Sequence, residues 1–359
     1  MYMKETMMTY INEQESICND ILNKYIENNI DFERIVKEKG NKKWLIIATG
    51  SSLNAVLSSK YYIQKISGIT IDIIEPFTFI NYEELDKDID MVLAISQSGK
   101  SASTIEALKK VHYNYENITT VSVTSDINSK ITEYSDVIID IGCGIEKVGF
   151  VTKGFTSTVL TLMLMGISAA KGLNKLSASE EKKEIREFNN LINKMPLIIE
   201  KTEYFYNKYK NELNKIPRFS IIGYGPTFGV AKEAETKFAE TVRVPTQGFE
   251  LEAFMHGPYL EVDNNYGIFF IYSENNHSQR AEKLKKYFSD YTNYCYEIST
   301  KVNQYGKYIS LDMDIDEYKS PLLLVIVFQV LSYRISEGRG IDLSKKIFED
   351  FDNILKSKI

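Results

Sequence analysis

Residues 91–104, MVLAISQSGKSAST, constrain this chain more than any other stretch. Five apolar residues run directly into a loop rich in hydroxyl groups, and the residues that follow, 105–112, are suited to a helix. A short apolar run of this kind is typical of a strand buried on both faces of a parallel sheet. A strand, a small loop and a helix together direct backbone N–H groups at an anion. The same residues are also compatible with an ordinary turn in which a serine is the helix N-cap and no ligand binds.

The loop lacks the signatures of nucleotide binding. It has no lysine in a Walker-type context and no G-x-G-x-x-G pattern. If an anion binds here, we therefore expect the phosphate of a small molecule and not a nucleoside triphosphate.

The rest of the first half alternates strand patterns with helix patterns. Further strands are predicted at 44–48, 69–74, 120–124 and 137–141, and a long apolar helix at 154–172. Such alternation is typical of a doubly wound α/β sheet with right-handed crossovers.

After Pro217 the pattern starts again. Strands are predicted at 218–222, 266–272, 294–298 and 308–311, followed by a second long apolar helix at 321–338. The fold class is therefore α/β, with two doubly wound parallel sheets related by duplication and a helical segment before them. The predicted organisation is an N-terminal helical segment (1–40), a first domain (41–175), a helical connector (176–216), a second domain (217–340) and a tail (341–359).

Composition limits the class of protein. The chain has 359 residues, 43% of them hydrophobic, and a net charge of −6, which disfavours nucleic-acid binding. Three cysteines far apart in the sequence, Cys18, Cys143 and Cys295, give neither a disulfide framework nor a zinc pattern. No signal peptide is visible, and the apolar helices are expected to fall short of the about 20 residues that a membrane span needs. These features predict a cytoplasmic protein without a membrane segment.

Few residues stand out for acid–base chemistry. Of the three histidines, His112 and His277 lie in helical or polar surroundings, whereas His256 lies in EAFMHGP, where Gly257 and Pro258 force a turn directly after it. A structural role for His256 is equally compatible with this context.

One predicted helix, 230–242, carries charged residues on a single face. Glu233, Lys237 and Glu240 recur at helical spacing. A solvated stripe of ion pairs is the usual meaning of such spacing. The functional alternative is a carboxylate that faces a cleft beside a lysine that sets its pKa.

Four motifs resemble sugar isomerase (SIS) domains. SQSGKSAST after a buried strand resembles the family's phosphate-binding loop, and TGSS (49–52) resembles its first, sugar-phosphate loop. Residues 231–258 are similar, without a gap, to the segment of glucosamine-6-phosphate synthases that carries the isomerase glutamate and the ring-opening histidine. TKGFTST (152–158) is similar to stand-alone enzymes with two SIS domains, the fructosamine-6-phosphate deglycases.

The resemblance implies roles for individual residues. It implies Glu240 as the proton shuttle, His256 as the residue for ring opening and Lys237 as a cleft lysine. It also implies that the substrate is bound by two loops, the phosphate by Ser96, Gln97, Ser98 and Ser101 and the sugar by Ser51 and Ser52, with Lys153 as a further substrate-binding residue. It implies a homodimer in which His256 could act in the partner's site, and it calls for no metal or organic cofactor.

The resemblance to the synthases is incomplete. The sequence shows no glutaminase domain, and the tail after Gly340 does not match the synthases' C-terminal lysine segment. We therefore expect a deglycase that releases glucose 6-phosphate and a free amine from a fructosamine 6-phosphate. The alternatives are an aldose–ketose isomerase or aminosugar-phosphate deaminase, and a non-catalytic sugar-phosphate-binding regulator.

Overall fold

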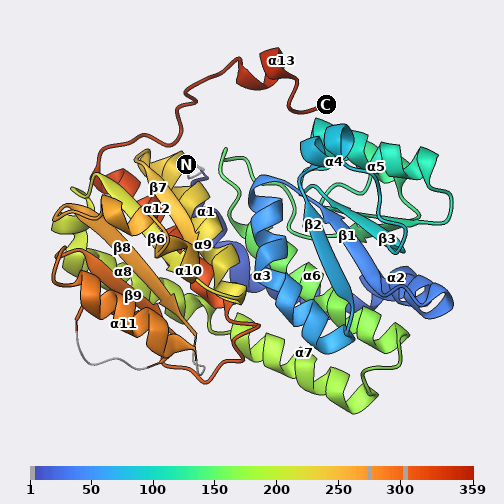
Figure 1. The fold of residues 1–359 in the computed structure, drawn as a ribbon, viewed down its shortest axis with the longest axis horizontal. Coiled ribbons are helices and arrows are strands. Elements are labelled where there is room, and N and C mark those ends of the chain that lie inside the picture. Colours follow the sequence, from blue (N-terminus) through green and yellow to red (C-terminus); the bar gives the residue numbers. More distant parts are fainter. Residues whose placement is uncertain (1–4, 274–276, 302–305) are drawn as a thin grey trace. The chain divides into compact units, whose positions relative to one another are not determined.

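The chain folds into two compact units, each built on one parallel β-sheet (Figure 1). The computed structural model describes residues 5–273, 277–301 and 306–359. We call the two units the first-sheet unit and the second-sheet unit and describe each by itself. The first-sheet unit comprises Ser16–Lys147, Lys153–Asn189 and Lys346–Ile359. The second-sheet unit comprises Asn190–Lys345, Val148–Thr152 and the described residues up to Glu15.

The first sheet has five parallel strands in the order β2-β1-β3-β4-β5. The strands are β1 (Lys43–Ile47), β2 (Thr70–Ile74), β3 (Met91–Ile95), β4 (Thr119–Thr124) and β5 (Val137–Asp140). Alternate side chains of the central strand β3 enter two different cores: Leu93 packs in one and Val92 in the other. Every residue of β3 is therefore buried, as its apolar sequence predicts.

Helices cover both faces of this sheet. One face packs against α2 (Tyr25–Lys39), α3 (Gly50–Ser67) and α6 (Lys153–Gly172). The other face packs against α4 (Pro76–Tyr82) and α5 (Ala102–Asn114). The result is the predicted three-layer, doubly wound arrangement.

The second sheet repeats the strand order of the first. Read from its opposite edge it runs β7-β6-β8-β9-β10, and this matches the first sheet strand for strand. The strands are β6 (Arg218–Gly223), β7 (Thr246–Glu250), β8 (Tyr266–Tyr272), β9 (Cys295–Ser299) and β10 (Tyr308–Ser310). Its main helices are α8 (Met195–Leu213), α9 (Pro226–Lys237), α11 (Ser278–Phe288) and α12 (Pro321–Gly338). The predicted fold class, two duplicated α/β sheets, is confirmed.

Two elements of the repeat escaped the sequence analysis. Strand β7, TQGFE, is an edge strand with a glycine and three polar residues, so it lacks the apolar run that marks its neighbours. Helix α11, SQRAEKLKKYF, buries only three of its residues, Ser278, Ala281 and Phe288. Both elements depend on tertiary contacts more than on their local sequence.

The N-terminal segment is helical, as predicted, but it forms two helices. Helix α1 (Met7–Asn23) is followed after Lys24 by α2, which packs on α6. Helix α2 ends at Gly40, whose left-handed conformation (φ 67°) allows its N–H to donate to the carbonyl of Val36. The predicted connector is also helical, as α7 (Ala178–Ile192) and α8, while the tail contains the short helix α13 (Phe351–Leu355).

The two long apolar helices bear on the expectation about membrane spans. Helix α6 has 20 residues and α12 has 18, so both are long and apolar enough to cross a membrane by length and composition alone. The expectation that the apolar helices fall short of that length is wrong for α6. Within the fold, however, the whole apolar window of α6 and 78% of that of α12 are buried. Packing against α3 and α8 accounts for this apolar sequence.

Candidate active site

The hydroxyl-rich loop begins where β3 ends. The N–H of Ser96 donates to the carbonyl of Val123 on β4 (3.1 Å), and the N–H of Gly99 donates back to Ser96 (2.9 Å). Gly99 has φ +67°, and a Cβ there would lie 1.8 Å from Oγ of Ser129. Only glycine fits this turn, because both the backbone conformation and the space exclude a side chain.

Hydroxyls of the loop surround the start of helix α5. The N–H of Ser101 lies 3.4 Å from Oγ of Ser96, and Thr104 donates to Oγ of Ser101 (2.9 Å). Ser101 is the N-cap residue of α5 but makes no side-chain cap bond. The first N–H groups of a helix and its dipole favour an anion. The loop therefore has the chemistry of an anion site.

The TGSS motif reaches the same edge of the sheet. Thr49 is extended, and helix α3 begins at Gly50 (φ 58°), which places Ser51 and Ser52 in its first turn after β1. Strands β1 and β3 are parallel neighbours, and the order of the sheet reverses between them. Ligands of doubly wound sheets bind at this switch point, outside the carboxyl ends of the strands. The structure thus brings the two predicted loops to one edge.

Lys153 lies beside the same loop. It is the first residue of α6 and only 6% exposed. The N–H of the next residue, Gly154, donates to Oε1 of Glu146 (2.8 Å), and a Cβ on Gly154 would lie 3.2 Å from Cγ of Gln97. The start of α6 therefore packs against the side chain of Gln97. The sequence analysis did not single out Glu146.

A lysine between two carboxylates lies in the second-sheet unit. Nζ of Lys237 lies 2.5 Å from Oε2 of Glu240 and 3.6 Å from Oε1 of Glu233. Lys237 and Glu233 are fully buried, whereas the Glu240 side chain is 36% exposed. A solvated stripe of ion pairs is therefore the wrong interpretation for Glu233 and Lys237. Helical spacing indicated the contact between them, but burial could not be read from it.

The helix changes its winding at this group. Helix α9 ends at Lys237, and the chain continues as a π-helical turn, Phe238–Val242, before Arg243 adopts a left-handed conformation (φ 59°). π-Turns are rare and occur frequently at functional sites. This turn carries Glu240, so the carboxylate that lies beside Lys237 is partly open to solvent.

His256 lies on a separate, exposed turn. It follows the short helix α10 (Leu251–Phe254), whose N-terminus is capped by the carboxylate of Glu250. Gly257 after it has φ +127°, so the predicted turn at this position is confirmed. Lys237 and Glu240 are therefore in direct contact. His256 lies on a different loop of the second-sheet unit, after β7 and α10.

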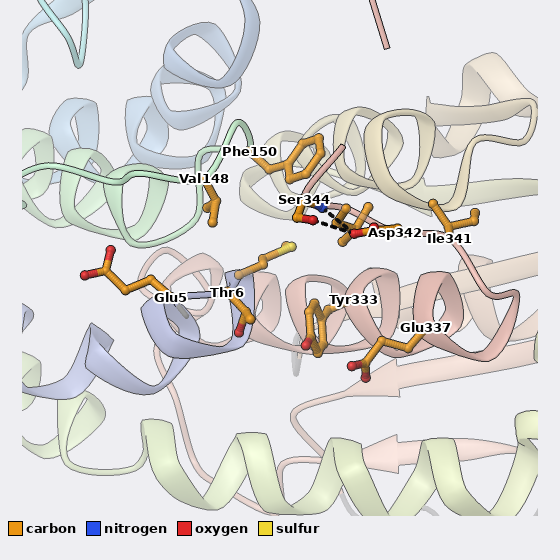
Figure 2. A pocket seen from close by; sticks show the side chains of 11 residues that line it. Glu5, Thr6, Val148, Phe150, Tyr333, Glu337, Ile341, Asp342 and Ser344 are labelled. Atoms are coloured by element: carbon orange, nitrogen blue, oxygen red, sulfur yellow. Dashed lines mark hydrogen bonds between the residues drawn. The ribbon is translucent and has the colours of Figure 1, made fainter. Parts of the chain in front are cut away.

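A cavity of about 340 Å³ lies elsewhere in the second-sheet unit (Figure 2). It is formed by the start of α1, residues 148–150, the end of α12 and residues 341–344. Its carboxylates have partners: Glu337 pairs with Arg334, and Asp342 accepts from Ser344. None of the residues predicted for catalysis or phosphate binding lines it.

Comparison with known proteins identifies the class. Residues 39–171 match the SIS domain family, so this part of the chain is an SIS domain. The match covers the whole of the first sheet and both hydroxyl-rich loops. The second sheet has the same strand order as this matched part of the chain.

The curated relatives are longer proteins. The chain is 27% identical, over 84% of its length, to a glutamine–fructose-6-phosphate aminotransferase (isomerizing) of Pyrobaculum aerophilum. It is 24% identical, over 95% of its length, to the enzyme of that name from Wigglesworthia glossinidia brevipalpis. The matches cover 49% and 57% of these relatives, so the chain spans about half of their length.

Solved structures share the whole fold. A Clostridium difficile 630 protein, provisionally assigned as a phosphosugar isomerase, superposes with a TM-score of 0.89 at 26% identity, covering 98% of each chain. The C-terminal domain of glucosamine-fructose-6-phosphate aminotransferase from Francisella tularensis gives 0.84 at 21% identity, covering 95% of this chain and 98% of that domain. A glucosamine-6-phosphate deaminase from Thermotoga maritima gives 0.71 at 20% identity, covering 94% and 96%. The suspected resemblance to two-SIS-domain proteins is confirmed.

Proposed function

We propose that this chain is a sugar-phosphate deglycase that splits a fructosamine 6-phosphate into glucose 6-phosphate and a free amine. The observation that carries the proposal is Glu240, a carboxylate partly open to solvent and held against the buried Lys237 on a π-turn of an SIS-type fold. Proton transfer between adjacent carbons needs a positioned carboxylate of this kind.

The phosphate would anchor the substrate at the first sheet. Ser96, Ser98 and Ser101 supply hydroxyl groups there, directly before helix α5. Gln97, Ser51, Ser52 and Lys153 are assigned to the rest of the sugar phosphate. A fixed phosphate orients the reacting carbons and so converts remote binding into rate.

Glu240 would move one proton between two carbons. It takes a proton from C1 of the ketosamine while the carbonyl oxygen on C2 gains one, which gives a 1,2-enaminol. It returns the proton to C2, and the nitrogen loses its proton, which leaves an imine at C1. Water then adds to C1 and the C–N bond breaks, so that an aldehyde and an amine are released. Lys237 stabilises the negative charge that develops near Glu240.

His256 would open the sugar ring. An imidazole can give a proton to the ring oxygen and take one back, as a general acid and base. In a homodimer, which we also propose, this histidine could serve the partner's site. A cytoplasmic location is part of the same proposal.

Related activities use the same proton transfer. The relatives are described as an isomerizing aminotransferase acting on fructose 6-phosphate and as a glucosamine-6-phosphate deaminase. Isomerisation or deamination by this chain is therefore the second candidate. The tail after Gly340, which lacks the synthases' lysine segment, favours the deglycase.

The test is a substrate panel. Fructosamine 6-phosphates that carry different amines, together with glucosamine 6-phosphate and fructose 6-phosphate, are incubated with the chain while glucose 6-phosphate and its isomers are quantified. Release of glucose 6-phosphate and amine from a fructosamine 6-phosphate is expected. Turnover of glucosamine 6-phosphate or fructose 6-phosphate alone would replace the proposal with the deaminase or isomerase. Saturable binding without turnover of any compound would indicate the regulator.

A further inference from the structure

A buried thiol connects the three segments that follow β3, β4 and β5, three adjacent strands of the first sheet. Cys143 lies after β5 and is fully buried. Its Sγ lies 2.8 Å from Oγ of Ser125, which follows β4, and 3.4 Å from Nε2 of Gln97, which follows β3. The mechanism above gives this thiol no role.

The hydrogen-bond pattern requires the sulfur to be an acceptor toward Gln97. Burial raises the pKa of the Cys143 thiol, so it keeps its proton at neutral pH. That single proton has two oxygen acceptors within reach, the carbonyl of Gly144 (3.4 Å) and Oγ of Ser125 (2.8 Å), and either atom of the Ser125 pair can be the donor. With the proton used at one of these oxygens, the sulfur accepts from Nε2 of Gln97. A flipped Gln97 amide would place Oε1 against a sulfur whose proton is already used.

The surroundings confine the same side chain. The N–H of Ser125 donates to the Gln97 carbonyl (2.9 Å), which fixes the backbone. Gly154 packs closely against this side chain, since a Cβ there would lie 3.2 Å from both Cγ and Cδ of Gln97 and 2.8 Å from Oε1 of Glu146. Oε1 of Gln97 accepts no hydrogen bond from the part of the chain that the structure describes.

We propose that Cys143 is a positioning residue that orients the Gln97 amide so that Oε1 accepts a hydrogen bond from a sugar hydroxyl. The inference rests on the proposed binding of a sugar phosphate at this edge. Phosphate oxygens are acceptors, so Oε1 has nothing to offer them. Binding of the phosphate is left to the serine hydroxyls and the start of α5. The thiol therefore distinguishes a sugar phosphate from inorganic phosphate.

The experiment compares two ligands across matched cysteine variants. Affinities for glucose 6-phosphate and for inorganic phosphate are measured by calorimetry on the full chain. Cys143→Ala is expected to weaken glucose 6-phosphate by about tenfold, the size of one lost hydrogen bond, with phosphate affinity unchanged. Cys143→Ser, which still accepts and donates, is expected to restore most of the loss. Cys295→Ala is the control, since Cys295 is a buried thiol of the second-sheet unit, 7% exposed.

Other outcomes overturn the inference. Equal weakening of both ligands in Cys143→Ala would show general damage to the loop, and unchanged affinity for both would show no positioning role. Gln97→Ala and Ser98→Ala separate this inference from the proposed function. If Ser98→Ala weakens both ligands while Gln97→Ala weakens neither, the phosphate site stands and the role of Cys143 falls. If neither variant alters either affinity, the proposed phosphate site itself falls.

Discussion

At the scale of single residues, Lys237 is a buried charge of the second-sheet unit held between two carboxylates. It is fully buried between Glu233, also fully buried, and Glu240. A buried charge persists only with close partners, and removal of one partner leaves the other with an uncompensated charge. The group therefore contributes to stability as well as to the proposed chemistry.

Lys237→Met is expected to destabilise the protein strongly. Glu233 would lose a cationic partner inside the fold, which costs about 3–5 kcal/mol for a buried pair. The free energy of unfolding in urea measures this loss. Lys232→Met is the control on the same helix, because Lys232 pairs with Glu235 at about 30% exposure and such pairs contribute about 1 kcal/mol or less. Equal losses in the two variants would refute the special position of Lys237.

Substitutions of Gly99 and Gly50 by alanine distinguish the cost of backbone strain from the cost of steric crowding. Gly99→Ala combines a left-handed φ of +67° with a Cβ that would lie 1.8 Å from Ser129 Oγ. Gly50→Ala imposes a similar φ of +58° with nothing within 4 Å. Strain alone costs about 1–2 kcal/mol, so Gly50→Ala should lose about that much and Gly99→Ala clearly more. Thermal unfolding of both variants tests this, and equal losses would show that Ser129 moves aside freely.

At the scale of elements, the apolar strands and long helices could be predicted from the sequence. The polar elements that are defined by contacts with their neighbours could not. The run from Met91 to Ile95 predicted a buried strand, and the structure confirms it. Strand β7 and helix α11 are polar, and only their places beside β6 and β8 define them. The π-turn after Lys237 has no sequence signature either. Hydrophobic periodicity in a sequence indicates which residues are buried. The pairing of edge strands and irregular helix winding depend instead on neighbours that are distant in sequence.

The candidate site follows the same rule. Loops adjacent to buried strands, with Ser96 to Ser101, could be located because composition and spacing are local. The contact between Cys143 and Gln97 spans 46 residues of sequence, so no local pattern announces it. The buried state of Glu233 was also hidden, because identical spacing occurs on solvated helices.

The hydroxyl loop and the π-turn are expected to have separable effects. Ser98→Ala should raise the apparent dissociation constant of the sugar phosphate about tenfold with little change in kcat, because one hydrogen bond to the anchor is lost. Glu240→Gln should lower kcat by about two to four orders of magnitude with binding retained, because proton transfer is lost. Steady-state kinetics and ligand titration measure both. A Ser98→Ala enzyme with normal affinity but lost turnover would contradict this division.

At the scale of the whole molecule, the duplicated architecture divides the proposed tasks. The first sheet carries the hydroxyl loops and Lys153, and the second carries Lys237, Glu240 and His256. The proposed homodimer makes His256 the natural candidate for exchange, because it lies on an exposed turn.

Subunit complementation tests whether His256 serves its partner. Glu240→Gln and His256→Ala are each expected to be inactive alone. If His256 acts in the partner's site, a heterodimer of the two variants has one site with both changes and one site with neither. A mixture exchanged to equilibrium then contains about half heterodimers, so it should recover about a quarter of the wild-type kcat per chain. Activity of the unmixed variants after the same exchange treatment is the control. A mixture that stays inactive, although mass measurement shows heterodimers, would place His256 in the site of its own chain.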